Sequence, residues 1–261
     1  MELIRFTCNA CKKECECPPD QLGREIPSCE RCGSTVRFRA VVDAVVRVLT
    51  DGESLPLPDL SRTSARGIGF SDWYVMAGLL EERANYMNTF YEREPRLDIT
   101  DPPRGILGSC DFVICSDVLE HVVPPVARGF EGVRALLRPG GILVLTVPWR
   151  LRGPTVEHYP NLHRYEIVDL GGPVVVNRTT AGTVEVFDGP VFHGGAGLTL
   201  EMRTFSFPDV MRHLERAGFT SIELAPEAPA YGVFGCGAIP HLGIYDDMPG
   251  HSVALLARRS E

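Results

Sequence analysis

The sequence predicts an α/β protein with a mostly parallel central sheet and a small cysteine-rich domain in front of it. Residues 110–149 place an apolar strand, a loop, an amphipathic helix, a turn and a second apolar strand in the order of a right-handed βαβ unit. Two C-x-x-C pairs lie within the first 40 residues, a pattern typical of a zinc site. We therefore expect one domain over 1–40 and a second over 41–261, with an insert at about 150–205.

Composition narrows the class of protein. Hydrophobic residues make up 44% of the 261 residues and the mean hydropathy is near zero, as in ordinary globular proteins. No apolar run approaches the roughly 20 residues of a spanning helix, and the first residues lack a signal-peptide pattern. We therefore expect a cytoplasmic protein without a membrane partner. The formal net charge of −8 disfavours a nucleic-acid partner, which would require a basic face.

The nine cysteines favour metal ligands and free thiols over disulfides in such a compartment. Four of them are the predicted ligands of a structural zinc ion: Cys8, Cys11, Cys29 and Cys32. Cys15 is an alternative to Cys11, in a C-x3-C register. The ion is expected to hold together a zinc ribbon that is too small for a core of its own. Residues 1–40 carry seven Lys or Arg against six Asp or Glu, which makes this ribbon a poor candidate for nucleic-acid binding.

The patterns between the ribbon and the βαβ unit predict two helices and two strands. Apolar residues at helical spacing predict a helix over 41–49 that lies on the main sheet. A strand is expected over 64–70, followed by a helix through Glu82 with Ser71 or Asp72 as its cap. The second strand is expected over 85–91, from its β propensity.

The central βαβ unit is the clearest pattern in the chain. Asp111–Cys115 is the first strand, Pro124-Pro125 opens the helix, and Arg138–Gly141 ends it. The run 142–147 is almost uniformly apolar, which is typical of a covered central strand. Because ligands bind beyond the carboxyl ends of parallel strands, the segment Ser116–His121 is expected at the binding site.

Two stretches of this unit carry a family resemblance. The stretches D-x-V-x-x-S-D-V-L-E-H-V, from Asp111, and L-R-P-G-G-x-L-x-L-T-V-P, from Leu137, closely resemble the class I S-adenosylmethionine-dependent methyltransferases. The resemblance implies a Rossmann-like methyltransferase sheet with an antiparallel last strand. It also implies S-adenosylmethionine as cofactor and S-adenosylhomocysteine as product.

The resemblance carries specific residues to the cofactor site. In the family, an acid followed by glycines forms the turn after the first strand; this chain departs from that pattern, with Gly67 at the position of the acid. The implied cofactor-binding residues, from the first, second, third and fourth strand ends in turn, are Gly67, Gly69, Ser71, Tyr91, Asp98, Ser116, Asp117 and His121. Tyr91, with Glu92 as its alternative, would face the ribose, and Asp98 the adenine.

The insert carries the candidate catalytic residues. It follows the fifth strand of the family fold and is therefore expected over the cofactor's methyl group. Because histidine suits proton removal near neutral pH, His158 and His163 are the leading candidates for a general base, with His193 third. A divalent-metal site formed by Glu157, His158 and His163 is an open alternative.

The end of the chain predicts a hairpin, a helix and two strands. A β-hairpin is expected over 174–187, with its turn near Ala181-Gly182. A helix over 207–217, capped by Ser206 and stopped by Gly218, should precede strands over 221–225 and 252–258. The segment 231–248 matches no pattern.

A wider resemblance bears on function. The ribbon, N-T-F-Y with E-P-R-L-D-I-T, E-H-Y-P-N-L-H and V-F-H-G-G together resemble a bacterial methyltransferase subgroup with an amino-terminal zinc ribbon, whose members often accompany glycosyltransferases or natural-product pathways. This implies O-methylation of a small hydroxylated acceptor, such as a sugar or glycoside. Two alternatives stay open: an inactive methyltransferase-fold interaction protein, motivated by the altered glycine turn, and a methyltransferase for RNA or protein. The oligomeric state stays open as well.

Overall fold

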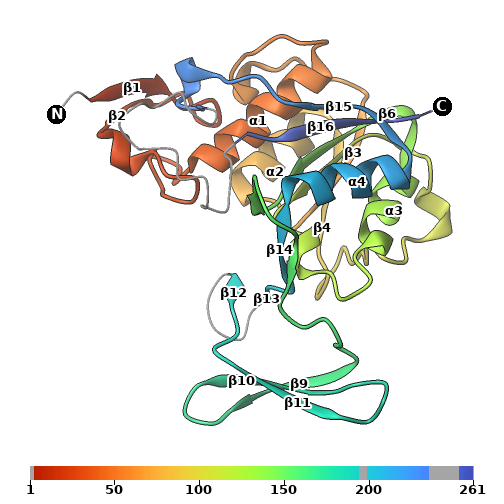
Figure 1. Ribbon diagram of the computed structural model, residues 1–261. Helices are drawn as coiled ribbons and strands as arrows, with labels where there is room; N and C mark the ends of the chain where they lie inside the picture. Colours follow the sequence, from red (N-terminus) through yellow and green to blue (C-terminus); the bar gives the residue numbers. More distant parts are fainter. Residues whose placement is uncertain (1–2, 194–198, 235–252, 261) are drawn as a thin grey trace.

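The computed structural model describes residues 3–193, 199–234 and 253–260 and has a six-stranded sheet at its centre (Figure 1). The strands lie in the order β15 (Phe219–Leu224), β16 (Leu255–Arg259), β6 (Leu137–Thr146), β5 (Cys110–Ser116), β3 (Arg66–Phe70) and β4 (Asn85–Thr89). The pairs from β6 through β4 are parallel, whereas β16 is antiparallel to both of its neighbours. The predicted fold class is therefore confirmed, including the antiparallel last strand.

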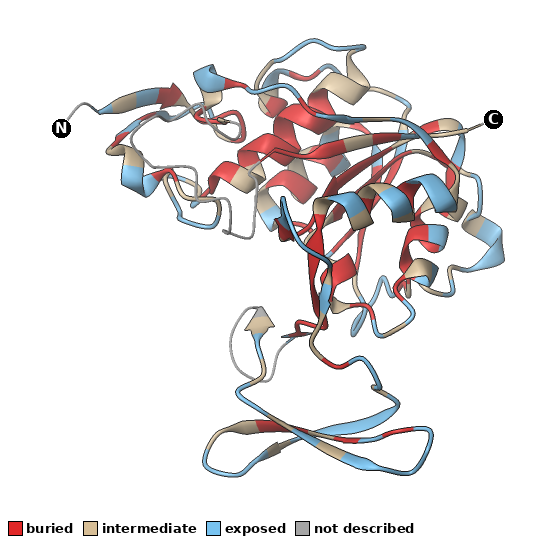
Figure 2. Ribbon diagram, viewed as in Figure 1, coloured by how far each residue is buried: buried red, intermediate tan, exposed pale blue. Residues whose placement is uncertain are grey.

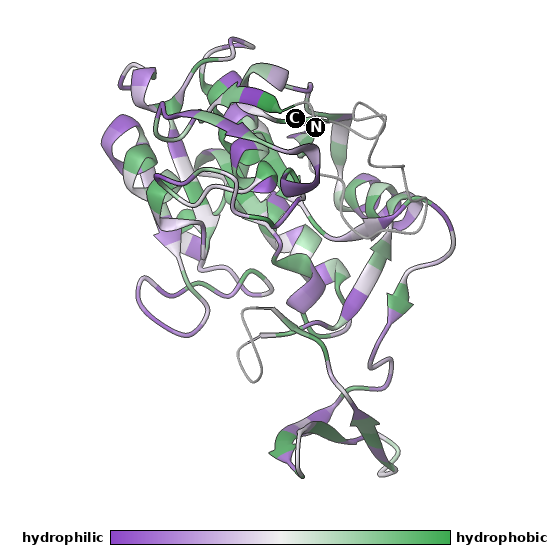
Figure 3. Cartoon of the chain, turned by 90° about the vertical axis from the view of Figure 1, so that its left-hand side faces the viewer, coloured by the Kyte–Doolittle hydropathy of each residue, from purple (hydrophilic) through white to green (hydrophobic). Residues whose placement is uncertain are grey.

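Four helices cover the two faces of this sheet. They are α1 (Val36–Leu49), α2 (Tyr74–Arg83), α3 (Ala127–Leu136) and α4 (Phe207–Ala217). Alternate residues of a strand point to opposite faces: Phe112 and Ile114 pack in one core cluster with α1 and α2, whereas Val113 and Cys115 pack in the other with α3 and α4. Figure 2 shows the buried residues gathered on the sheet and the inner helix faces, and Figure 3 shows hydrophilic segments along the outer loops.

The N-terminal segment is joined to the main body through α1. Its hairpin consists of β1 (Ile4–Thr7) and β2 (Glu14–Cys17). The helix predicted over 41–49 begins earlier, at Val36, because the Thr35 side chain accepts a hydrogen bond from the Phe38 N–H and caps it there. Residue 40, the expected domain boundary, thus lies inside a continuous helix.

Arg39 connects this segment to the distant end of the chain. Its side chain is fully buried. The guanidinium donates to the carbonyl oxygens of Ser34 (3.1 Å), Tyr231 (2.7 Å) and Gly232 (3.3 Å), and it lies over the Phe6 ring. A buried charge requires such a complete set of partners.

The second strand is followed by a connection without a helix. A single bridge from Phe90 to Arg96 brings the chain back to the sheet edge, and residues 97–101 then run as a turn segment. The expected cap of α2 is wrong: Trp73 is the N-cap and no side chain caps it. Asp72 is unavailable because its carboxylate accepts a hydrogen bond from Tyr86.

The insert forms small sheets beside the main one. One contains β7 (Trp149–Arg150), β14 (Arg203–Ser206) and β8 (Val156–Glu157); another is the hairpin of β12 (Phe192–His193) and β13 (Thr199–Leu200). The third contains β9 (Arg164–Asp169), β10 (Pro173–Arg178) and β11 (Val184–Asp188), and Figure 1 shows it projecting from the body. The predicted hairpin over 174–187 corresponds to β10 and β11, and β9 is a third strand that the prediction lacked.

Five short 3-10 helices connect the larger elements of the described residues, and α4 is the last of the α-helices among them. The 3-10 helices are η1 (Pro19–Gln21), η2 (Leu57–Asp59), η3 (Arg104–Ile106), η4 (Leu119–His121) and η5 (Pro229–Tyr231). The ends of α4 are as predicted, with Ser206 as cap and Gly218 in the left-handed region at its end. Most of the unassigned segment 231–248 lies outside the described residues, and within those residues no helix is long and apolar enough to cross a bilayer.

Gly132 provides a test of how α3 is packed. A Cβ atom at this position would lie 1.6 Å from the backbone oxygen of Ile99, so Gly132→Ala should displace the chain at Ile99 and lower the free energy of unfolding by about 1–3 kcal/mol. Gly78→Ala in α2 is the matched control, because its Cβ meets nothing within 4 Å. The control should be neutral or stabilising by up to about 1 kcal/mol. Urea unfolding of both variants measures the difference, and equal stabilities would contradict this account of the packing.

Candidate active site

A cavity of about 1000 Å³ lies beyond the carboxyl ends of β3, β4 and β5. Parallel strands bring these ends to one edge of the sheet, where ligands bind in open α/β folds. Three parts of the chain form its walls: the strand-end segments, the N-terminal segment through Arg24 and Arg37, and the insert through residues such as Tyr165 and Leu200. The volume is at the upper end of small-molecule sites.

Six of the eight predicted cofactor residues line this cavity: Ser71, Tyr91, Asp98, Ser116, Asp117 and His121. The other two, Gly67 and Gly69, lie inside β3 and face packed side chains. A Cβ on Gly67 would lie 2.1 Å from the Phe112 ring, and one on Gly69 would lie 1.8 Å from the Asp72 carboxylate. The packing around β3 thus accounts for both glycines.

The turn after β3 is fixed by bonds to β4. The Asn88 side chain accepts a hydrogen bond from the Asp72 N–H (2.9 Å) and donates one to the Asp72 carbonyl oxygen (3.1 Å). The Tyr86 hydroxyl donates to the Asp72 carboxylate. Ser71, between β3 and these bonds, has a φ of +55°, an uncommon conformation for a residue other than glycine. Burial raises the pKa of the Asp72 carboxyl to about 7, against the opposing effects of Tyr86 and Arg37.

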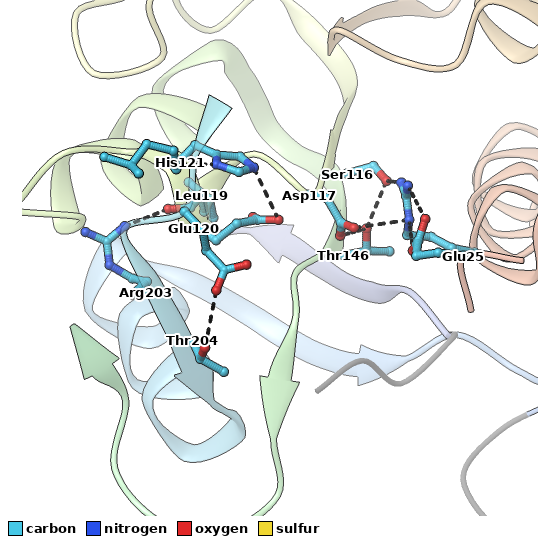
Figure 4. Close-up of polar contacts among 12 residues, drawn as sticks. Glu25, Ser116, Asp117, Leu119, Glu120, His121, Thr146, Arg203 and Thr204 are labelled. Carbon is cyan, nitrogen blue, oxygen red and sulfur yellow. Dashed lines mark hydrogen bonds and ion pairs between the residues drawn. The ribbon is translucent and has the colours of Figure 1, made fainter. Parts of the chain in front are cut away.

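The turn after β5 carries the second strained residue of the cavity. Asp117 has a φ of +53°. Its carboxylate accepts two hydrogen bonds from Arg24 (2.7 and 2.6 Å) and one from Thr146 (2.9 Å), and lies 3.1 Å from the Arg37 Nε. Burial opposes ionisation, but the two guanidinium groups and Thr146 prevail and lower the pKa of Asp117 to about 2. Figure 4 shows Asp117 beside Ser116 and Thr146, facing Glu25.

The wall after β4 contains both apolar and charged residues. Leu97 and Ile99 are buried and line the cavity on either side of Asp98. One oxygen of Asp98 accepts from both the N–H (2.8 Å) and the hydroxyl (2.7 Å) of Thr100, so this residue also fixes its own turn. Tyr91 lies at the rim, 58% exposed.

His121 faces the cavity from η4. Its Nδ1 lies 2.9 Å from the Leu200 carbonyl oxygen. Because a carbonyl oxygen only accepts, Nδ1 carries the proton, and the neutral ring has its acceptor at Nε2. That atom is 3.8 Å from the Glu120 carboxyl (Figure 4), which burial and the nearby Asp117 charge keep at a strongly raised pKa.

The insert histidines are placed differently. His158 does not line the cavity; its Nε2 lies 3.1 Å from Glu201. The exposed His163 is also outside the cavity wall, and its backbone N–H donates a hydrogen bond to the Asn177 side chain. The side chain of His193, in β12, lies outside the described residues. Within the described part of the chain Glu157 pairs with Arg203 at 2.7 Å, and no metal cluster joins it to these histidines.

Four cavity residues come from the region 1–40, which was assigned only to metal binding: Glu25, Phe38, Arg24 and Arg37, the last two being bonded to the end of β5. No local pattern marks the two arginines, because their partners Ser116 and Asp117 are 79 or more positions away in the chain. The same holds for Tyr165 and Leu200, whose approach to the strand ends depends on how the insert folds back.

The four predicted zinc ligands are close together in space. The ligand atoms of Cys8, Cys11, Cys29 and Cys32 lie within 4.8 Å of one another. The distances of 3.6 Å from Cys8 to Cys32 and from Cys11 to Cys29 fit tetrahedral sulfur coordination with bonds of about 2.3 Å. Cys15 lies outside this group, with its thiol directed to the Lys13 carbonyl oxygen. Burial opposes ionisation of Cys29, but the N–H groups of Cys32 and Arg31 lower its pKa to about 7, which favours a thiolate.

Asp72 provides a test of the buried turn. Folding raises the pKa of the Asp72 carboxyl, so the folded protein loses stability as the pH rises above the ordinary carboxyl pKa of 3.8. This loss is complete above about pH 7. Asp72→Asn should therefore be more stable than the wild type by an amount that grows from pH 5 to 7, on the order of 3 kcal/mol, and is constant above. Denaturant unfolding between pH 5 and 8 measures it.

Tyr86→Phe is the companion variant for this test. It removes the donor to the carboxylate and should lower the stability, because the hydrogen bond favours the charged form. A pH-independent difference between the wild type and Asp72→Asn would contradict the account of Asp72.

Several solved structures are similar to this chain at low sequence identity. Solved structures with similar folds include a 1,6-didemethyltoxoflavin N1-methyltransferase from Burkholderia thailandensis (15% identity, 86% of this chain and 79% of that chain, TM-score 0.42). They also include a methyltransferase from Clostridium acetobutylicum (10%, 86% and 92%, TM-score 0.47) and an amino pentose methyltransferase from Micromonospora echinaspora (16%, 87% and 93%, TM-score 0.44). No curated protein matches the chain.

The family match falls on the strands that carry the cavity. Residues 87–145 match the family model described as a methyltransferase domain. They span the end of β4, all of β5 and α3, and β6 up to its penultimate residue, and they include the predicted residues Tyr91, Asp98, Ser116, Asp117 and His121. This part of the chain is therefore similar to a methyltransferase domain.

Proposed function

We propose that this protein is an S-adenosylmethionine-dependent methyltransferase that acts on an oxygen atom of a small hydroxylated acceptor, such as a sugar, a glycoside or a natural-product intermediate. The observation that carries the proposal is the cavity in which cofactor-side residues of the sheet meet residues of the insert. About 1000 Å³ accommodates a cofactor together with a small molecule, and the insert supplies a partly aromatic wall through Tyr165 and Phe192.

The cavity residues fit the cofactor in one orientation. Leu97, Ile99 and Val122 offer an apolar surface beside Asp98, which suits an adenine ring with its hydrogen-bonding edge. The charged end of the cavity, at Ser116 and Asp117, suits the amino-acid part. When bound, S-adenosylmethionine supplies a methyl group on a positively charged sulfur; the chain's residues hold the acceptor in line with it and take up the acceptor's proton.

His121 is our first choice for the general base. It lines the cavity, and the Leu200 carbonyl oxygen orients its ring so that Nε2 can accept a proton. The buried Glu120 carboxyl lies 3.8 Å from Nε2. His158 is the second choice, since Glu201 orients it in a similar way but it stands behind the cavity wall.

The substrate class is tested with the purified protein, S-adenosylmethionine and a panel of sugars, glycosides and matched amino sugars. We expect S-adenosylhomocysteine to form together with an acceptor that has gained one methyl group on a hydroxyl oxygen. Methylation only at nitrogen or carbon would overturn the oxygen assignment, and methylation only of RNA or protein would overturn the acceptor class.

His121→Gln tests the base. Loss of a general base lowers turnover by about 100-fold or more, so kcat should fall to that extent while the Kd for S-adenosylhomocysteine changes little. His163→Gln is the comparison, because His163 lies outside the cavity. Steady-state kinetics and calorimetric titration measure both quantities. If His163→Gln loses turnover and His121→Gln retains it, the base lies in the insert as the sequence alone suggested.

Zinc binding by the four-cysteine cluster is the second part of the proposal, with residues 1–40 as a metal-held ribbon and 41–261 as the methyltransferase domain. Cys32→Ser removes a ligand and should reduce the zinc content well below one ion per chain and lower the free energy of unfolding, because metal binding stabilises the folded ribbon.

Cys15→Ser is the matched control, since Cys15 is buried nearby but outside the cluster. It should retain zinc. Elemental analysis after gel filtration measures the metal content, and unchanged zinc in Cys32→Ser would contradict the ligand assignment.

A further inference from the structure

Arg24 and Arg37 reach the cavity from the N-terminal segment and meet the end of β5. Arg24 donates to both oxygens of Asp117, while Arg37 donates to the Ser116 hydroxyl at 2.8 Å. Their side chains are only 11% and 12% exposed. At such burial these contacts are not ordinary surface ion pairs, which would contribute little.

Glu25 completes a charge cluster with these residues. It accepts from Arg37 at 2.6 and 2.8 Å and also pairs with Arg24. The cluster thus contains two guanidinium groups, Arg24 and Arg37, and two carboxylates, Glu25 and Asp117, and all four line the cavity. A balanced cluster of this kind is complementary to a zwitterion such as an amino acid, which carries an ammonium and a carboxylate group on the same carbon.

The amino-acid end of S-adenosylmethionine is such a zwitterion, with an ammonium and a carboxylate group. The buried side chains of Leu97 and Ile99, which also line the cavity, offer apolar surface that suits the adenosine. Guanidinium groups bind carboxylates through paired N–H donors. The arginines of the N-terminal segment are therefore matched to the carboxylate.

The two arginines stand close to the second cysteine pair in the chain. Arg24 stands five residues before Cys29, and Arg37 five residues after Cys32, so the two flank the second cysteine pair. The Arg37 N–H also donates to the Arg24 carbonyl oxygen (3.2 Å), which closes the loop that contains the pair. The position of both guanidinium groups is thus coupled to the geometry of the metal-ligand loop.

We propose that the N-terminal ribbon is part of the cofactor site: Arg24 and Arg37 bind the methionine carboxylate of S-adenosylmethionine, and metal in the four-cysteine cluster is required to position them. The inference rests on the assigned cofactor pocket and is independent of the acceptor. It gives the ribbon a role in cofactor affinity, so the loss of metal would weaken cofactor binding before any acceptor is involved.

A pair of ligands tests the proposal. S-adenosylhomocysteine contains the amino-acid end, whereas 5′-methylthioadenosine lacks it and retains the adenosine. Arg37→Gln and Arg24→Gln should each weaken S-adenosylhomocysteine binding by about tenfold or more, and change 5′-methylthioadenosine binding less than about threefold. Arg5→Gln is the control, because Arg5 forms an exposed ion pair with Glu16 in the same ribbon; both affinities should stay as in the wild type.

The metal arm uses the full-length protein before and after chelation of zinc. Circular dichroism is recorded first, to establish that the methyltransferase core is still folded. In folded, metal-free protein the affinity for S-adenosylhomocysteine should fall as in the arginine variants, that for 5′-methylthioadenosine should be kept, and added zinc should restore the first. If chelation unfolds the core, the arginine variants, which retain the cysteines, decide the role of the arginines, and Cys32→Ser decides the metal's role.

Several outcomes overturn the inference. Unchanged S-adenosylhomocysteine affinity in both arginine variants would remove the carboxylate contact. An equal loss for both ligands would mean that the arginines only shape the pocket, and a metal-free protein with full affinity would remove the coupling. Wild-type protein that binds neither ligand would instead refute the cofactor pocket itself, whereas failure to find an acceptor would leave these binding results standing.

Discussion

The carboxylate of Asp117 is the group through which sheet, ribbon and cavity are held together. It follows β5 in a backbone conformation that costs energy for a residue with a side chain, and two arginines of the N-terminal segment and Thr146 of β6 offset that cost. Without these partners a buried carboxylate would be strongly destabilising. The family resemblance points to the sheet, yet one wall of the cavity depends on contacts from residues that precede it.

The parts of the fold that depend on neighbours in sequence could be predicted. The βαβ unit, the caps of α4 and the hairpin of β10 and β11 are all specified by apolar period and turn residues within a few positions. The start of α1 was missed although its cap is local, since Thr35 accepts from the N–H of Phe38 three residues on. The N-cap of α2 was missed because Asp72 bonds to the distant Tyr86.

The site was predictable only on the side that the strands provide. Ser116, Asp117 and Asp98 follow strand ends, and a parallel sheet brings such ends together whatever else the chain does. The other cavity residues include Arg24, Arg37 and Tyr165. They reach the cavity because the ribbon docks on the sheet and the insert folds back, and no periodic pattern in the local sequence predicts either arrangement. Because histidine can accept a proton near neutral pH, the sequence favoured His158 and His163. The burial and orientation of a side chain depend on tertiary structure, however, and of these three histidines only His121 lines the cavity.

Arg39 has a consequence for how the chain is made. Its guanidinium bonds to Tyr231 across 192 positions of sequence, so the ribbon's buried contact with the body cannot form until most of the chain has left the ribosome. Contacts of such long range carry a large loop-closure cost and form late. The N-terminal segment, although synthesised first, therefore completes its docking to the body among the last steps of folding.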